Sequence, residues 1–298
     1  MRLGLQLPSF TFPGGPAELR SHLTEIAEAA DAAGFSSLWV MDHLFQLPED
    51  TGWGGPEEPM LEAYSTLGFL AGVTSRVRLG ALVGCAMFRE PGLLLKTATT
   101  VDVLSGGRLT FGIGAGWYER EARGLGIAWP ERSERFARLE ETLRLAHQVW
   151  ADDRSAFIGR FSTLAEPIIR PMPLSRPHPP IMVGGNGERR TLRLVAQYAD
   201  ACNFLVLEPD EIRGRMRALR AHCDAIGRDV SEIEITALDE VDLRPGRMTP
   251  GDVIARARAQ SDAGVEHLIV NMPDAWDVRH LELIGREVIP ELGAPVAA

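Results

Sequence analysis

The sequence predicts a (β/α)8 barrel, a closed ring of eight parallel strands that alternate with helices, with an insertion between the fourth and fifth strands. Three observations support this prediction. Eight short apolar runs rich in β-branched or aromatic residues recur along the 298 residues. Their starts lie about 20 to 40 residues apart, the spacing of a βα unit, except for one interval of about 70 residues. Both faces of these runs are apolar, which favours a barrel over an open sheet.

The expected strands are distributed over the whole chain, so we expect a single domain over residues 1–298. In chain order they are Arg2–Leu7, Ser36–Met41, Val77–Val83, Leu109–Gly114, Pro180–Val183, Ala201–Val206, Glu232–Leu238 and Glu266–Val270. The long interval after the fourth strand marks the insertion. Its part from Ala151 to Pro179 is rich in proline and lacks a helical period, so we expect it to be irregular.

Helices are predicted between the strands because apolar residues recur there at spacings of three and four, often before a glycine that ends the helix. The clearest sets are Leu19, Leu23, Ile26, Ala27 and Ala30 before Gly34; Leu93, Leu94, Thr97, Val101 and Leu104 before Gly106; and Phe136, Leu139, Leu143 and Trp150. We expect each apolar stripe to cover the barrel.

Composition narrows the functional classes. The chain is 45% hydrophobic and 24% charged, typical of a globular protein, and its net charge of −10 disfavours nucleic acid and anionic membranes as partners. Its three cysteines lie far apart and form no metal-binding motif, so we expect neither a disulfide framework nor a metal site. No apolar run approaches the ~18 residues of a membrane span, and we expect a cytoplasmic protein.

Candidate functional residues follow the strands, because the active site of such a barrel lies at the C-terminal strand ends. Asp42 and His43 follow the second strand and should face opposite sides, since successive residues of a strand alternate. His43 is the stronger candidate, although a structural histidine is also compatible with this position. Gly84 and Cys85 follow the third strand, and their small size would let a flat ligand approach the backbone. A tight turn with a buried thiol is the alternative interpretation.

Glycines also follow the fourth and fifth strands. The G-x-G-x-G run that ends at Gly116 is not a dinucleotide fingerprint; it suits either one wall of a cofactor pocket or close strand packing. The segment Gly184–Gly187, followed by Arg189 and Arg190 and then a helix, suits a phosphate cradle, with a plain glycine turn as the alternative.

Four motifs give the chain a resemblance to the luciferase-like flavin and deazaflavin oxidoreductases, in the branch that uses coenzyme F420. They are LGLQLPSFTFPGGP, SLWVMDHLFQ, EEPMLEAYSTLGFLAGVTSRVRLGALVGCAMFREPGLLLKTATTVDVLSGGRLTFGIGAGWYERE and PPIMVGGNGERRTLRLVAQYADACN. The resemblance runs over nearly the whole chain and implies the same barrel, a homodimer, and a ring lying against a bulge after the third strand, often with a non-proline cis peptide. The cofactor-binding residues it implies are Asp42, His43, Leu82, Val83, Gly84, Cys85, Ala115, Gly116, Gly184, Gly185, Asn186 and Gly187.

The resemblance implies hydride transfer between coenzyme F420 and a small organic substrate, which the sequence does not identify. We expect His43 to be the catalytic residue, with Glu119 and Gln6 as second choices for the proton donor. Trp117 stands where some relatives carry a catalytic glutamate, which argues against a sugar-phosphate dehydrogenase, and Cys85 stands where a relative has threonine. Three alternatives remain: an FMN-dependent monooxygenase, a catalytically silent cofactor-binding protein, and an unrelated phosphosugar enzyme.

Overall fold

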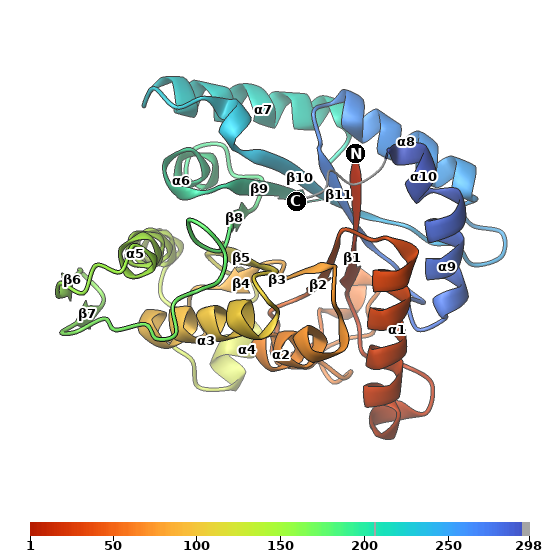
Figure 1. The fold of residues 1–298 in the computed structure, drawn as a ribbon, viewed down its shortest axis with the longest axis horizontal. Helices are drawn as coiled ribbons and strands as arrows, with labels where there is room; N and C mark the ends of the chain where they lie inside the picture. The colour runs from red at the N-terminus through yellow and green to blue at the C-terminus, as the bar shows by residue number, and fades with distance from the viewer. Residues whose placement is uncertain (206, 294–298) are drawn as a thin grey trace.

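The computed structural model describes residues 1–205 and 207–293, which form a barrel of parallel strands inside a ring of helices (Figure 1). The barrel strands are β1 (Arg2–Leu7), β2 (Ser37–Val40), β3 (Arg78–Ala81), β5 (Leu109–Gly114), β8 (Ile181–Gly184), β9 (Ala201–Leu205), β10 (Glu234–Glu240) and β11 (His267–Asn271). Each pairs in parallel with the next, and β11 pairs with β1 to close the ring. The predicted (β/α)8 barrel is therefore confirmed.

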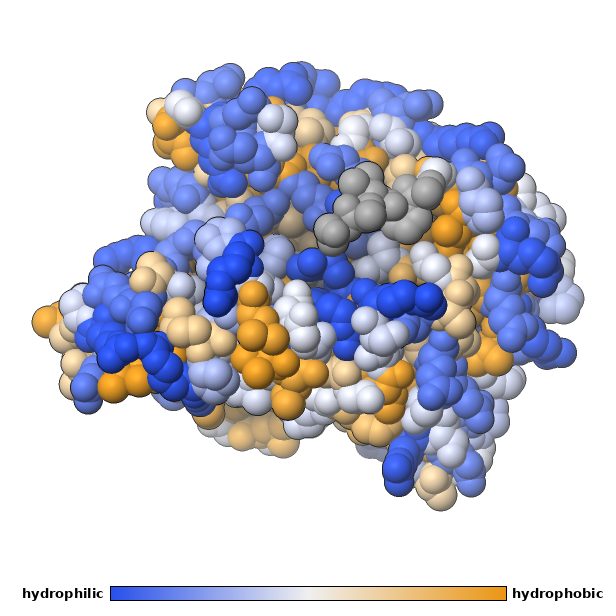
Figure 2. All heavy atoms as spheres, in the orientation of Figure 1, coloured by the Kyte–Doolittle hydropathy of each residue, from blue (hydrophilic) through white to orange (hydrophobic). Residues whose placement is uncertain are grey.

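The helices that cover the barrel contact one another in chain order, and the last of them contacts the first. They are α1 (Leu19–Ala33), α2 (Ala63–Val73), α3 (Pro91–Leu104), α5 (Arg132–Trp150), α6 (Thr191–Tyr198), α7 (Pro209–Asp224), α8 (Pro250–Asp262) and α9 (Val278–Glu287), with the short α10 (Ile289–Leu292) after them. Figure 2 shows hydrophilic residues over α7 and α8. No helix among the described residues is both long and apolar enough to cross a membrane.

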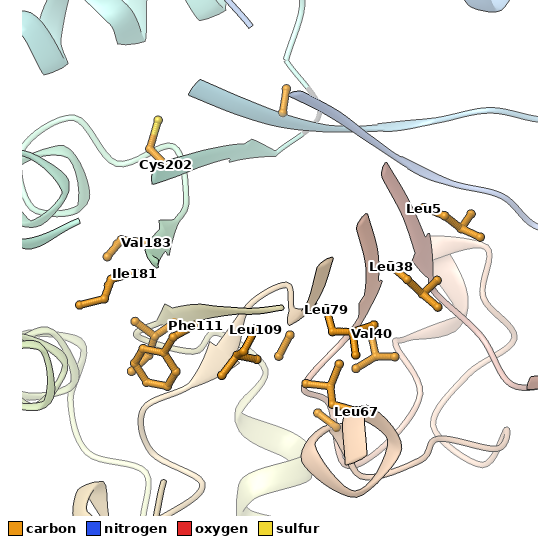
Figure 3. Close-up of a cluster of buried hydrophobic side chains, with 14 of the residues drawn as sticks. Leu5, Leu38, Val40, Leu67, Leu79, Leu109, Phe111, Ile181, Val183 and Cys202 are labelled. Carbon is orange, nitrogen blue, oxygen red and sulfur yellow. The ribbon is translucent and has the colours of Figure 1, made fainter. Parts of the chain in front are cut away.

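The core has two parts because successive strand residues point to opposite sides. Leu38 and Val40 of β2 belong to the larger cluster, which lies between strands and helices, whereas Trp39 between them belongs to a smaller cluster with Met182 and Ile269. Figure 3 shows the larger cluster, in which Leu67 of α2 lies beside Val40 and residues of neighbouring strands continue the layer. Alternate residues of one strand therefore pack against the helices and inside the barrel.

The predicted insertion lies between β5 and β8. It contains the short helix α4 (Glu119–Gly124), the long helix α5 and an antiparallel pair of two-residue strands, β6 (Phe157–Ile158) and β7 (Thr163–Leu164). No helix occurs between residues 151 and 179, as predicted, but the small hairpin was not expected.

Several strand boundaries differ from the prediction. The expected third strand, Val77–Val83, is instead β3 followed by β4 (Gly84–Cys85), and a cis peptide bond joins Leu82 to Val83 between them. The expected seventh strand starts later because residues 230–232 form a 3-10 turn. Residue 206 of the expected sixth strand lies outside the described residues, as do residues 294–298 of the predicted single domain, which stays a prediction.

A buried carboxylate fastens α1 to the start of β3. Asp31 accepts hydrogen bonds from the backbone N–H groups of Ser75, Arg76 and Val77 at 2.9, 3.0 and 2.7 Å. Burial alone raises the pKa of Asp31, but these hydrogen bonds outweigh it, and the pKa lies below its ordinary value. The ionised carboxylate is therefore part of the folded structure.

Candidate active site

Asp42 and His43 follow β2 at the mouth of the barrel and engage different partners, as the alternation of the strand predicts. The Asp42 side chain is fully buried, and the His43 side chain is 15% exposed. No hydrogen bond joins the two side chains in the described part of the chain. Each instead contacts a segment that follows another strand.

Asp42 anchors the loop that follows β3. Its carboxylate accepts the backbone N–H of Cys85 at 2.8 Å and both Nη atoms of Arg89, also at 2.8 Å. Arg89 in addition pairs with Glu62 and lies 4.8 Å from the centre of the Tyr64 ring. Burial lowers the pKa of Arg89, but the hydrogen bonds and charges of the two carboxylates outweigh it and raise that pKa above its ordinary value. Asp42 thus fixes the loop in place.

The segment between β3 and β4 bulges toward β5 and β8. The cis peptide between Leu82 and Val83 lies where the family resemblance implied one. A Cβ added to Gly184 would lie 2.8 Å from Val83 Cγ1, and one added to Gly114 would lie 2.9 Å from Val83 Cγ2. Glycine is therefore required on both neighbouring strands for Val83 to occupy this place.

The floor beneath the bulge holds a buried polar group. Gln6 of β1 donates a hydrogen bond from Nε2 to the Leu82 carbonyl at 3.4 Å. Its Oε1 is buried and has no partner among the described residues. An unsatisfied buried acceptor at the mouth of a barrel is a position that a ligand donor fits.

Cys85 is a buried thiol and not an exposed nucleophile. Burial raises its pKa to about 12. Its sulfur packs against the loop after β5, where a Cβ added to Gly116 would lie 2.6 Å from Sγ. Gly116 and the neighbouring Ala115 are half-buried, so both predicted residues of this wall lie at the mouth.

His43 is held by a carboxylate that sequence reasoning missed. Its Nδ1 lies 2.7 Å from Oε1 of Glu121 on α4, and Glu121 is 1% exposed. The other carboxylate oxygen accepts the backbone N–H groups of Leu44 and Phe45 at 2.6 and 3.1 Å. Because an ionised carboxylate only accepts hydrogen bonds, Nδ1 is the donor of this pair, and Nε2 is the ring nitrogen left for another partner.

Aromatic rings flank His43. The Trp117 ring, 59% exposed, meets the imidazole edge-on at 5.7 Å between ring centres, and Tyr118 lies at 6.1 Å. Glu119, a second choice for the proton donor, is instead half-exposed and paired with Arg123. The cluster places an apolar surface beside the His43 imidazole, which suits an organic substrate.

The loop from Gly184 to Gly187 leads from β8 to α6. The Asn186 side chain both donates to the Leu205 carbonyl and accepts the Leu205 N–H, at 2.9 Å each, so it fixes the loop to β9. Beyond it lies a cleft of about 710 Å³, lined by the loop from Asn186 to Thr191, the first turn of α5, and Arg215 of α7. No group of three metal-binding side chains gathers within residues 1–205 and 207–293.

The chain is similar to known proteins over most of its length. The family model for luciferase-like monooxygenases matches residues 1–267. The chain is 32% identical to an F420-dependent glucose-6-phosphate dehydrogenase of Amycolatopsis mediterranei, over 91% of this chain and 94% of that one. It is 26% identical to an FMNH(2)-dependent dimethylsulfone monooxygenase of Pseudomonas putida, over 73% and 61%. An F420-dependent secondary alcohol dehydrogenase superposes with a TM-score of 0.82 at 18% identity, over 98% of both chains.

Proposed function

Because this chain belongs to the luciferase-like monooxygenase family, we propose that it is an oxidoreductase that transfers a hydride between coenzyme F420 and a small organic substrate. The relative from Amycolatopsis mediterranei, which matches nearly end to end, supports F420 as the cofactor. The observation that carries the proposal is the His43–Glu121 pair at the barrel mouth, close in the chain to the Asp42 that anchors the bulge.

The residues at the mouth fit a flat ring with a phosphate-bearing side chain. In this proposal Leu82, Val83, Gly84 and Cys85 form one wall and Ala115 and Gly116 the other, while the loop Gly184–Gly187 holds the phosphate. The unpartnered Oε1 of Gln6 offers an acceptor beneath the ring. When bound, coenzyme F420 supplies the carbon that accepts or donates the hydride.

His43 moves the proton that accompanies the hydride. Glu121 keeps hydrogen on Nδ1, so Nε2 can accept a proton from a substrate hydroxyl during oxidation and return it during reduction. The exposed Trp117 ring beside it shields one side of the substrate. Asp42 keeps a positioning role, because all its contacts go to Cys85 and Arg89.

FMN is the second candidate cofactor, with an oxygen-dependent monooxygenase as the corresponding activity. The relative from Pseudomonas putida supports it, and a glycine loop holds the phosphate of either cofactor. Paired fluorescence titrations with F420 and FMN, oxidised and reduced, distinguish the two. Preferential binding of F420 is expected. Preferential binding of FMN would overturn the proposal. A His43→Ala variant that keeps both cofactor binding and turnover would refute only the role of His43.

We also propose a homodimer that forms through the outer faces of α2 and α3. Leu93 and Leu104, about three turns apart on α3, are 62% and 63% exposed. A groove of about 480 Å³ runs between the helices, and Cβ atoms added at Gly68 or Gly72 of α2 would meet nothing within 4 Å. Exposed apolar side chains beside small residues suit close helix packing.

The dimer is tested by sedimentation. The wild-type chain should sediment as a dimer and the Leu93→Glu variant as a monomer, whereas Ile158→Glu, equally apolar and 80% exposed on β6, should leave the dimer intact. A monomeric wild type would refute the interface. We further propose that the enzyme works in the cytoplasm, which its free, buried cysteines favour.

A further inference from the structure

The cleft beyond the Gly184–Gly187 loop is lined by arginines from three separate segments. Arg132 starts α5, Arg189 and Arg190 precede α6, and Arg215 lies on α7. The cleft contains two carboxylates, Glu131 and Glu188, so its lining is net positive in a chain of net charge −10. The charge of the cleft lining is therefore opposite in sign to the net charge of the chain.

Most of these guanidinium groups have no carboxylate partner. Within the described residues, Arg132, Arg189 and Arg190 form no ion pair, and only Arg215 pairs, with Glu188. The Nε of Arg215 is buried and unpartnered. The guanidinium carbons of Arg132 and Arg190 lie 5.8 and 5.6 Å from the centre of one ring, Phe136, which holds both groups beside the cleft.

The cleft is larger than a phosphate site requires. Its volume of about 710 Å³ extends from the glycine loop to α5 and α7, across arginines of three segments. A planar guanidinium forms paired hydrogen bonds with a carboxylate or a phosphate, so arginines spread along a cleft suit a chain of anionic groups. FMN ends at its phosphate, whereas the F420 side chain continues beyond its phosphodiester with glutamyl residues that each carry a carboxylate.

We propose that this arginine cleft, formed by Arg132, Arg189, Arg190 and Arg215, binds the glutamyl carboxylates of the F420 side chain and thereby selects F420 over FMN. The inference rests on the proposed function, because it requires F420 as the cofactor. It adds a second anchoring site, remote from the ring, whose ligand is a short acidic peptide-like chain. An anionic substrate is the other source of the same chemistry, and the experiment separates the two.

The test measures dissociation constants for three deazaflavins: one without phosphate, one with the phosphodiester but no glutamate, and F420 with several glutamates. In the wild type at low salt, the glutamates should tighten binding about tenfold, and added NaCl should reduce this gain. The Arg132→Gln/Arg189→Gln variant should lose the gain and bind the phosphate-free compound unchanged, which verifies its fold. Arg213→Gln, an exposed arginine of α7 paired with Asp210, is the control and should keep the gain.

Equal affinity for the two phosphorylated deazaflavins, or a gain that survives in the double variant, would overturn the inference and leave the proposed function standing. In a second outcome the glutamate gain is absent, and inorganic phosphate competes as strongly with the glutamate-free compound as with F420. This outcome would assign the cleft to a phosphate-bearing substrate and would also overturn the inference. Failure of every deazaflavin to bind would overturn the proposed function together with the inference.

Discussion

The buried ion pair of Asp42 and Arg89 predicts a large loss of stability when its charge is removed. In Asp42→Asn, one of the two oxygens becomes an amide that donates. In place of Oδ1 it faces Arg89 Nη2, and in place of Oδ2 it faces both Arg89 Nη1 and the Cys85 N–H donor. The Asp42 and Arg89 side chains are 0% and 12% exposed, so water does not replace the lost acceptor. Breaking such a pair costs about 3 to 5 kcal/mol, and since Glu62 still neutralises part of the Arg89 charge, we expect about 3 kcal/mol.

Urea denaturation followed by circular dichroism measures this change. Asp152→Asn is the matched control, because Asp152 also accepts two hydrogen bonds from one guanidinium, that of Arg170, but lies exposed. Its unfolding midpoint should equal that of the wild type. The Asp42→Asn variant should also bind F420 about tenfold more weakly, since the bulge it anchors forms a wall of the site.

A second variant separates the charge from the packing. Replacing Arg89 by methionine in the Asp42→Asn background removes the stranded guanidinium and should recover part of the lost stability. An Asp42→Asn protein with the wild-type midpoint would refute the buried ion pair as a stabilising element. A double variant less stable than Asp42→Asn would show that the aliphatic part of Arg89, and not its charge, matters.

Three further predictions concern the proton pathway, the ring site and the effect of pH. Glu121→Gln should lower kcat about 100-fold and change the F420 dissociation constant less than twofold, because it misorients His43 without touching the ring wall. Glu119→Gln is the control. An unchanged kcat in Glu121→Gln would contradict the positioning role. Gly184→Ala should weaken F420 binding at least tenfold, because the new methyl group would lie 2.8 Å from a side-chain carbon of the bulge, whereas Gly251→Ala should bind normally. Asp31 has a lowered pKa in the folded state, so its stabilising effect is complete above the unfolded pKa of about 4 and is lost as the pH falls. The difference in Tm between the wild type and Asp31→Asn should therefore be largest near pH 7 and shrink below pH 4; a difference independent of pH would refute this linkage.

The barrel was predictable because its strands and helices differ in hydrophobic period. The expected strands Arg2–Leu7 and Leu109–Gly114 have the same bounds in the structure. The third strand did not, because Val77–Val83 is apolar apart from Arg78 and its pattern carries no sign of the break between β3 and β4. Hydrophobicity records which residues are buried, not how the backbone is bent among them.

The site was predictable in its positions and not in its pairings. The alternation of β2 was enough to separate the directions of Asp42 and His43. Their partners are distant in the chain: Arg89 lies 47 residues from Asp42, and Glu121 lies 78 residues from His43. No local pattern connects these pairs, since they meet only because parallel strands bring their C-terminal ends together.

These pairings also explain why two buried carboxylates lie at the mouth. Beyond Val40 the chain leaves the sheet, and the N–H groups of Leu44 and Phe45 no longer have strand partners; Glu121 accepts both. Asp42 does the same for the N–H of Cys85. Buried backbone donors need acceptors, and carboxylates from neighbouring loops supply them here. Glu121 therefore both orients His43 and stabilises the irregular backbone after β2, so the orientation of His43 follows from the way this part of the mouth is held.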